Sequence, residues 1–307
     1  MRIFTRVVER RSFAQAAHDL VLAKSRVSEA VQRLERQLGV RLLTRTTRQV
    51  SPTPEGQEYF TRCLAILADL DAAEQAITSS LPTGPLRIHV HGTFSRHFLA
   101  PYLADFLDRY PGIELHIGEG DGLIDLVRDG IDCVIRIGEP SDSGLVGRRL
   151  GMLAEGTFAS PAYLEKHGTP VSPDDLAGHE MIGFVSTKTR LVIPLEFQVP
   201  GGLSMVSLKP KITVTAADTM ACLAIHGHGL IQVPRYRVAT ETANGLLVEV
   251  LPDYAPTPSP VYILHPDGTH LSSRTRAFID WVTKTLSERL QNEALTDQLR
   301  GEAATAS

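Results

Sequence analysis

"LAKSRVSEAVQRLERQLG", residues 22–39, decides the fold of the first part of this chain. Four apolar residues recur in it at steps of four, three and four, which predicts a helix with one buried stripe: Val27, Val31, Leu34 and Leu38. Ser25 is placed to cap the start of this helix, and Gly39 is placed to end it. The same stripe suits a core helix and a helix that lies in a DNA groove, so the flanks must decide.

The flanking segments favour a helix-turn-helix. Ser12 has the position of an N-cap for a preceding alanine-rich helix, whose buried stripe is Phe13, Ala16, Ala17 and Leu20. An alanine-rich helix allows the next helix to pack closely, as a helix-turn-helix requires. An earlier helix has Ile3, Phe4, Val7 and Val8 on one face, and "VRLLTRTTRQVSPTP" after Gly39 predicts a two-stranded basic wing.

The exposed side chains of the helix predicted over residues 22–39 are suited to contact DNA. Ser25 and Ser28 are short hydroxyls that can approach phosphates and bases, Arg26 can bind guanine in a bidentate manner, and Gln32 can reach adenine. Four residues of the wing suit backbone phosphates or a narrow minor groove: Arg45, Thr46, Thr47 and Arg48.

Charge is distributed unevenly along the 307 residues. Residues 1–60 contain eleven Lys or Arg and six Asp or Glu, a net charge of +5, which leaves −9 for the remainder because the whole chain carries −4. A basic head on an acidic body indicates that the head meets a polyanion.

The middle and the end of the chain have different patterns. Residues 55–80 predict one linker helix with a heptad seam of Phe60, Cys63, Leu67, Leu70, Glu74 and Ile77, which is typical of dimerisation. Residues 84–290 alternate strands and helices, which predicts an α/β domain with a mostly parallel sheet and helices on both faces. We expect two lobes, lobe I over about 84–157 plus 262–290 and lobe II over about 158–261. Residues 291–307 are expected to form a polar tail, disordered from residue 301.

The stretch "SFAQAAHDLVLAKSRVSEAVQRLERQLGVRLLTRTTRQVSPTPEG" resembles the winged helix-turn-helix of LysR-type bacterial transcriptional regulators. The resemblance continues through "GPLRIHVHGTFSRHFLAPYLADFLDRYPGIEL", "GIDCVIRIGEPSDSGLVGRRLG", "ASPAYLEKHGTPVSPDDLAGH" and "GHGLIQVP", and so covers nearly the whole chain in the family's order. It implies a winged helix-turn-helix domain over 1–54, the linker helix, and a two-lobed domain similar to periplasmic binding proteins.

The resemblance also implies roles for individual residues and partners. The residues expected to face the major groove of double-stranded operator DNA are Lys24, Ser25, Arg26, Ser28, Glu29, Gln32 and Arg33, and the wing would place Arg45, Thr46 and Arg48 on phosphates or in the minor groove. Glu29 departs from the basic or amide residue common there, and its carboxylate would accept from cytosine N4 or hold Arg26 or Arg33. The chain also begins several residues later than most relatives, so helix 1 lacks a first turn or the true start lies upstream. The family pattern implies dimers paired through the linker helix, association into tetramers, and RNA polymerase as a further partner.

A small-molecule effector is expected between the lobes. The resemblance puts His91, Thr93, Phe94 and Ser95 where the first strand opens into a helix, and free N–H groups at such a helix start bind anions. We therefore expect a small organic anion whose carboxylate meets Thr93 and Ser95 and whose apolar part meets Phe94. Ligands bind at the carboxyl ends of parallel strands, which adds Arg136 and Gly138, and the second lobe would contribute Thr219 and His226. The plainer alternative is that Ser95 is only a helix cap and Arg136 only an ion-pair partner.

Other functions lack a basis in the residues. The pairs His89/His91 and His226/His228 have spacings that can chelate, but no Cys or carboxylate cluster accompanies them, so neither a metal nor another cofactor is expected and His89 is expected to be buried. The chain has no GxSxG, P-loop or GxGxxG spacing, and therefore no catalytic constellation. Three separated cysteines, the absence of a signal-like segment and the absence of a long apolar run favour a cytoplasmic protein without membrane contact. The alternative is a solute-binding or small-molecule enzyme module with an accessory DNA-binding head.

Overall fold

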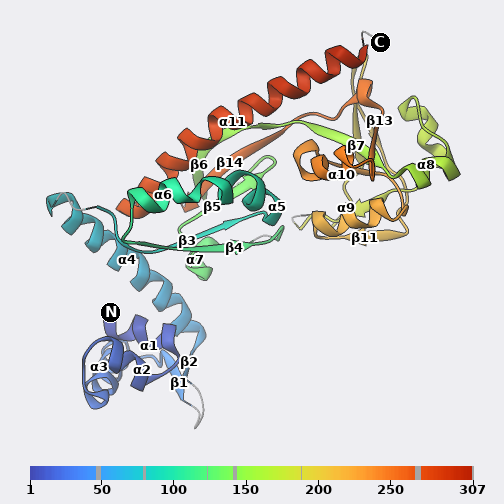
Figure 1. Ribbon diagram of the computed structural model, residues 1–307. Coiled ribbons are helices and arrows are strands. Elements are labelled where there is room, and N and C mark those ends of the chain that lie inside the picture. Colours follow the sequence, from blue (N-terminus) through green and yellow to red (C-terminus); the bar gives the residue numbers. More distant parts are fainter. Residues whose placement is uncertain are drawn as a thin grey trace.

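The computed structural model describes residues 1–45, 50–78, 81–122, 124–140, 144–187, 189–266 and 271–305. It consists of a small helical head, a connecting helix and an α/β body (Figure 1). Among the described helices, none combines the length and the apolar character needed to span a lipid bilayer.

Three short helices build the head: α1 (Arg2–Arg10), α2 (Phe13–Asp19) and α3 (Lys24–Leu38). Their apolar faces form one core, in which Phe4, Val7, Ala16, Val27 and Val31 are almost fully buried. The Ser12 hydroxyl accepts a hydrogen bond from the Gln15 N–H at 3.3 Å, which confirms the predicted cap of α2. Gly39 ends α3 in the left-handed conformation at φ 71°, as expected for glycine.

Two details of the predicted α3 are wrong. The helix begins at Lys24 with Ala23 as its N-cap, so Ser25 lies inside the first turn and does not cap it. The buried stripe ends at the half-buried Leu34, because the core of the head does not reach Leu38, which is 41% exposed.

The wing follows as an antiparallel pair of strands, β1 (Leu43–Arg45) and β2 (Val50–Pro52). It leads into α4 (Pro54–Thr78), whose start presses against the wing: a Cβ on Gly56 would lie 1.9 Å from the Leu42 carbonyl oxygen. A side chain does not fit at this junction, so the sequence needs glycine there.

The residues of the expected seam of the linker helix do not all lie in the same surroundings: some pack against the head and others are exposed. Cys63 is fully buried in the core of the head and Phe60 packs against the same core. Leu67 of the seam is half-buried and Leu70 is 47% exposed, as is Ile66, at 49%, which lies outside the predicted seam. Glu74 and Ile77 lie in the part of α4 whose side chains fall outside the structural description. Among the described side chains of α4, the exposed ones are therefore placed to meet a second copy.

Lobe I is built on a five-stranded sheet with the order β4-β3-β5-β14-β6. Its strands are β3 (Gly84–Val90), β4 (Ile113–Glu119), β5 (Cys133–Ile137), β6 (Leu145–Leu153) and β14 (Ser259–Pro266). β3 pairs in parallel with β4 and β5, whereas β14 runs antiparallel to β5 and β6. The sheet is therefore mixed. The chain leaves lobe I through the edge strand β6 and returns from lobe II through β14, which pairs antiparallel with both β5 and β6.

Helices cover both faces of this sheet, as expected. On one face the aromatic core joins α5 (Gly92–Phe94), the π-helical η1 (Ser95–Leu99), η2 (Ala100–Tyr102) and α6 (Leu103–Arg109) to α11 (Ser273–Thr305). On the other face lies α7 (Leu126–Asp129), whose Leu126 packs with Val134 and Leu264. Figure 1 shows α11 running along lobe I and extending toward lobe II. The expectation of disorder from residue 301 is wrong as far as residue 305, because the last helix continues to that residue.

Lobe II contains three small sheets. The first has the order β12-β7-β13, and the other two are β8 with β11 and β9 with β10. The strands are β7 (Glu155–Ala159), β8 (Ile182–Phe184), β9 (Leu195–Val199), β10 (Gly202–Val206), β11 (Ile212–Val214), β12 (Ile231–Pro234) and β13 (Val248–Val250). Its helices are α8 (Pro161–His167), η3 (Pro173–Gly178), α9 (Ala217–Ile225), η4 (Arg235–Val238), α10 (Ala239–Ala243) and η5 (Pro252–Tyr254).

Candidate functional site

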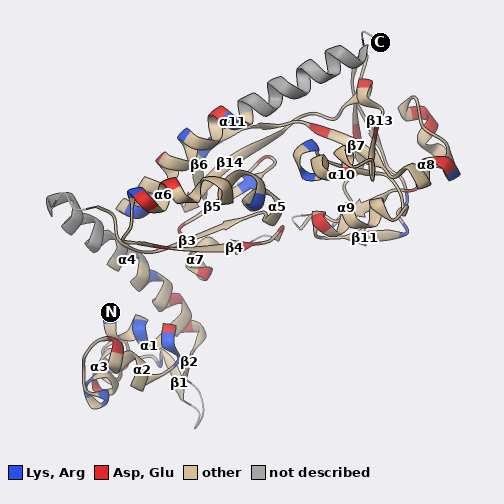
Figure 2. Cartoon of the chain, viewed as in Figure 1, with Lys and Arg blue, Asp and Glu red and all other residues tan. Residues whose placement is uncertain are grey.

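The outer face of α3 presents polar side chains over three turns. Because Val27 and Val31 are buried, the opposite face is turned outward. Ser28 is half-buried, and six other predicted DNA-contacting residues are exposed: Lys24, Ser25, Arg26, Glu29, Gln32 and Arg33. Basic residues lie on both α1 and α3 of the head (Figure 2). The seven residues therefore lie on the solvent-facing side of α3, spread around roughly half of its circumference at about 100° per residue.

Glu35 fixes the wing relative to α3. One of its carboxylate oxygens accepts hydrogen bonds from the N–H groups of Leu42 and Leu43, at 2.9 and 3.1 Å. The wing strand β1 includes Arg45, paired with Val50, but the Arg45 side chain is outside the description, as are residues Thr46 and Arg48. Sequence reasoning missed Glu35, although an acid at that position of a basic helix was the available signal.

A cavity of about 350 Å³ lies between the two lobes. Lobe I contributes His91, Ile137 and Gly138 to its wall, and most of the remaining wall comes from lobe II. The apolar part of the wall includes Met181, Ile182, Phe184, Leu195, Met220 and Val233. Ile193 and Met205 also line the cavity and are about half exposed, at 48% and 52%. The cavity is thus an apolar chamber with a few polar groups, the usual character of a small-molecule site.

The residues predicted to bind an effector are only partly gathered at this cavity. His91 and Gly138 line it, and Thr93 lies in an adjoining polar groove of about 400 Å³. Arg136 is held nearby, donating to the carbonyl oxygens of Gly120 at 3.5 Å and Gly122 at 3.0 Å, so it orders this loop. Burial lowers the pKa of its guanidinium.

Four of the predicted effector contacts lie elsewhere. Phe94 is fully buried, and its ring packs 4.7 Å from Phe98 in the core of lobe I, so its predicted place in the cleft is wrong. Ser95 is 5% exposed, within the same turn. His226 is the C-cap of α9 and lines neither of the two hollows described above, and Thr219 is exposed outside both of them. The sequence pattern did not predict the direction in which these side chains face.

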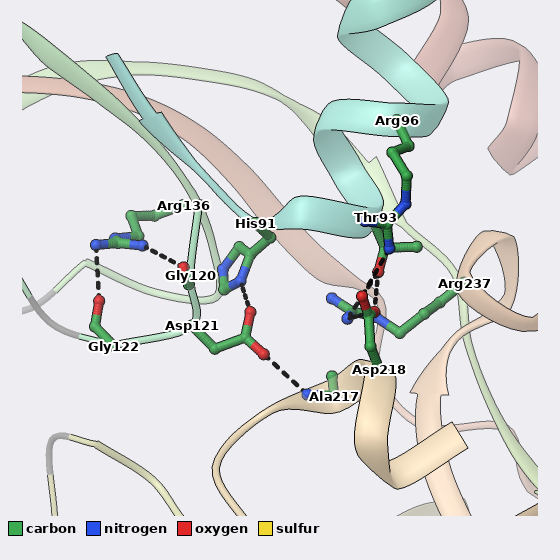
Figure 3. A network of polar contacts seen from close by, with 10 residues as sticks. All are labelled: His91, Thr93, Arg96, Gly120, Asp121, Gly122, Arg136, Ala217, Asp218 and Arg237. Atoms are coloured by element: carbon green, nitrogen blue, oxygen red, sulfur yellow. Dashed lines mark hydrogen bonds and ion pairs between the residues drawn. The ribbon is translucent and has the colours of Figure 1, made fainter. Parts of the chain in front are cut away.

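Two aspartates cross the cleft and join the lobes (Figure 3). Asp121, which follows β4 in lobe I, contacts the His91 imidazole and accepts from the Ala217 N–H at the start of α9, at 2.8 Å. Asp218 of α9 accepts from the Thr93 hydroxyl and from Arg96 Nη2, the latter at 2.6 Å. We call the Asp121 and Asp218 contacts the interlobe latch.

The latch carboxylates are ionised and well supported. Burial raises the pKa of Asp121, but the hydrogen bonds from His91 and Ala217 outweigh it and hold its pKa at about 2. Burial acts in the same direction on Asp218, and the hydrogen bonds from Thr93 and Arg96 again give a net lowering of its pKa. Sequence reasoning missed both residues, because the contact between Asp121 and Ala217 spans 96 positions of the chain.

Two acidic side chains of lobe II line the cavity itself. Burial raises the pKa of Glu155, at the start of β7, to about 7, despite a hydrogen bond from Ser259. Glu196 lines the same wall, and its carboxylate accepts from the Thr257 N–H at 2.9 Å. His89 is buried, as predicted, and its burial lowers the pKa of the imidazole.

Comparison with known proteins matches two families. The family described as "Bacterial regulatory helix-turn-helix protein, lysR family" matches residues 1–57, and "LysR substrate binding domain" matches residues 79–287. The uncharacterized HTH-type transcriptional regulator YhjC of Escherichia coli K12 is 38% identical over 295 residues, which cover 94% of this chain and 98% of that protein. An HTH-type transcriptional repressor of Pseudomonas aeruginosa is 37% identical over 297 residues, covering 94% and 92%. The solved structure of CrgA, a LysR-type transcriptional regulator from Neisseria meningitidis, is 35% identical with a TM-score of 0.58, covering 92% of this chain and 97% of that one.

Proposed function

The chain belongs to the LysR family of transcriptional regulators, and on that premise we propose that it binds operator DNA through α3 and the wing under the control of an effector in the interlobe cavity. It is a transcriptional regulator and not an enzyme, so the alternative of a solute-binding or enzyme module with an accessory head is set aside. The observation that carries the proposal is the accessible polar face of α3, held on a closed core beside a wing.

Within this proposal the contacts of the head divide into two kinds. Arg26 and Gln32 read base edges in the major groove, with Lys24, Ser25, Ser28, Glu29 and Arg33 around them. Arg45, Thr46 and Arg48 of the wing meet phosphates or the minor groove and set the register. The exposed position of Arg26 on the first turn of α3 supports the first assignment.

We infer a dimer that pairs through α4, further association into tetramers, contact with RNA polymerase, and a cytoplasmic location. The half-exposed Ile66 and Leu70 of α4 support the pairing. A dimer presents two copies of α3 to the two halves of a pseudo-palindromic site. The domain division that accompanies this proposal is 1–54, 55–80 and 84–290.

Effector binding acts by changing how the lobes meet. A ligand shifts a conformational equilibrium only by its differential affinity for the two states. The cavity wall comes from both lobes, and the interlobe latch crosses the same cleft, so a ligand there contacts both sides of the moving joint. The change in the lobes then alters the spacing of the heads and the bend of the DNA.

The test is binding of the full chain to the DNA upstream of its own gene, followed by fluorescence anisotropy at 50–200 mM salt. A regulator is expected to lose affinity steeply with salt, on the order of 10³-fold or more for six or more phosphate contacts. It is also expected to protect one preferred site. Equal affinity for that fragment and for a shuffled sequence of the same composition would refute the proposal.

A further inference from the structure

The groups that would attract an organic acid to the cleft are already occupied by the protein's own carboxylates. The Asp218 carboxylate accepts hydrogen bonds from the Thr93 hydroxyl and from Arg96. Nη1 of Arg237 lies 3.4 Å from Oδ1 of Asp218 (Figure 3). Asp121 takes the N–H at the start of α9 and the imidazole of His91. A free N–H at a helix start and a guanidinium are the usual partners of a carboxylate, so both places for an anion are filled.

The charges that remain at the cavity are also unfavourable to an anion. Among the described residues, two basic side chains line the cavity wall, His91 and Arg237, and each faces a latch aspartate. The other ionisable groups of the wall are the carboxyls of Glu155 and Glu196. A ligand carboxylate would therefore find each of these basic side chains already paired with an aspartate, and it would lie near the carboxyls of Glu155 and Glu196 of lobe II.

One buried donor of a residue that lines the cavity lacks an acceptor. The Arg237 side chain is 5% exposed, and within the described residues its Nε has no hydrogen-bond partner. A buried N–H without an acceptor is costly, and a ligand oxygen that accepts from it removes that cost. An uncharged carbonyl or hydroxyl oxygen supplies such an acceptor without adding a negative charge beside Asp218.

We propose that Asp121 and Asp218 determine the specificity of the effector cleft: they exclude organic acids, so the cavity takes an uncharged, mainly apolar molecule with a carbonyl or hydroxyl group. This inference rests on the proposed function only in naming the cavity as the effector site. It replaces the expectation of a small organic anion bound by Thr93 and Ser95, because Asp218 holds the Thr93 hydroxyl and Ser95 is buried.

The test compares two probes of the same shape, 3-phenylpropionamide and 3-phenylpropionate, by calorimetric titration of the full-length protein. Wild type is expected to bind the amide in preference to the acid. Asp218→Asn frees Arg96 and Arg237, and so is expected to raise the affinity for the acid at least tenfold and for the amide by less than threefold. Asp218→Glu keeps the charge and is expected to keep the exclusion. Asp280→Asn removes an exposed carboxylate on α11 and is expected to behave as wild type.

Each outcome decides the inference. A wild-type protein that binds the acid as tightly as the amide overturns it, and so does an Asp218→Asn protein that folds normally but gains no affinity for the acid. Gain of acid binding in that variant supports the inference even if wild type binds neither probe. The anisotropy assay on DNA is independent of these titrations, so a failure of the proposed function is recognised separately.

Discussion

Glu155 offers a quantitative test of how the cleft is built, because its pKa differs between the folded and unfolded chain. Burial raises the pKa from the ordinary 4.5 to about 7 in the folded protein. A carboxyl whose pKa is raised on folding stabilises the folded state fully at a pH below its unfolded pKa. This stabilisation is lost as the pH rises through the pKa of the folded state. The whole difference is about 3 kcal/mol, from ~1.4 kcal/mol for each pKa unit, and about 2.5 kcal/mol of it falls between pH 5 and pH 8.

The perturbation is Glu155→Gln, which keeps the shape and removes the titration. The chain has a single tryptophan, Trp281, buried in the core of lobe I, so its fluorescence reports urea unfolding of the body. We expect the variant to gain stability relative to wild type by about 2.5 kcal/mol as the pH rises from 5 to 8. Comparison at each pH removes the contribution of the other titrating groups, which the two proteins share.

Glu165→Gln is the matched control, because Glu165 is exposed on α8 of the same lobe. Its stability is expected to follow that of wild type at every pH. If the difference between Glu155→Gln and wild type is the same at pH 5 and pH 8, Glu155 is not protonated in the folded cleft and the reasoning is refuted.

Two further predictions concern the head. Arg26→Ala is expected to relax base preference by about 1–3 kcal/mol whereas Arg48→Ala weakens binding to all sequences similarly, as measured by anisotropy on an operator and its single-base variants; equal, sequence-independent losses would contradict the groove assignment. Gly56→Ala places a Cβ against the Leu42 carbonyl oxygen and is expected to destabilise the head by about 1–3 kcal/mol in thermal unfolding, while Gly178→Ala, which meets nothing within 4 Å, serves as the control; an unchanged melting temperature in both would show that the junction is not tightly packed.

The sequence predicted the parts of the head that depend on local spacing. Residues three and four apart share a helix face, so the burial of Val27 and Val31 followed from the pattern, as did the caps at Ser12 and Gly39. Leu38 fits the same pattern but is exposed, because periodicity gives a face and not the extent of the surface that covers it.

The cleft was less predictable, because its decisive contacts join distant segments. The residue after β3, His91, lines the interlobe cavity, yet Phe94 faces the core while its neighbour Thr93 meets Asp218, 125 residues further along the chain. Successive side chains on a helix point in directions about 100° apart around the helix axis. The rule that ligands bind at strand ends does not fix that direction. Pairings such as Asp121 with Ala217 depend on how two lobes dock, which local pattern does not encode.

The central claim is that the joint between the lobes sets how the heads engage DNA. It is tested most directly by DNA footprinting and DNA-bend measurement on a variant that lacks the interlobe latch contacts. The double variant Asp121→Asn/Asp218→Asn removes both crossing carboxylates while leaving every residue of α3 and the wing in place. The account predicts that this protein binds the same operator with a changed footprint length and bend angle. An unchanged footprint and bend, in a variant shown by solution scattering to have altered lobe positions, would contradict it.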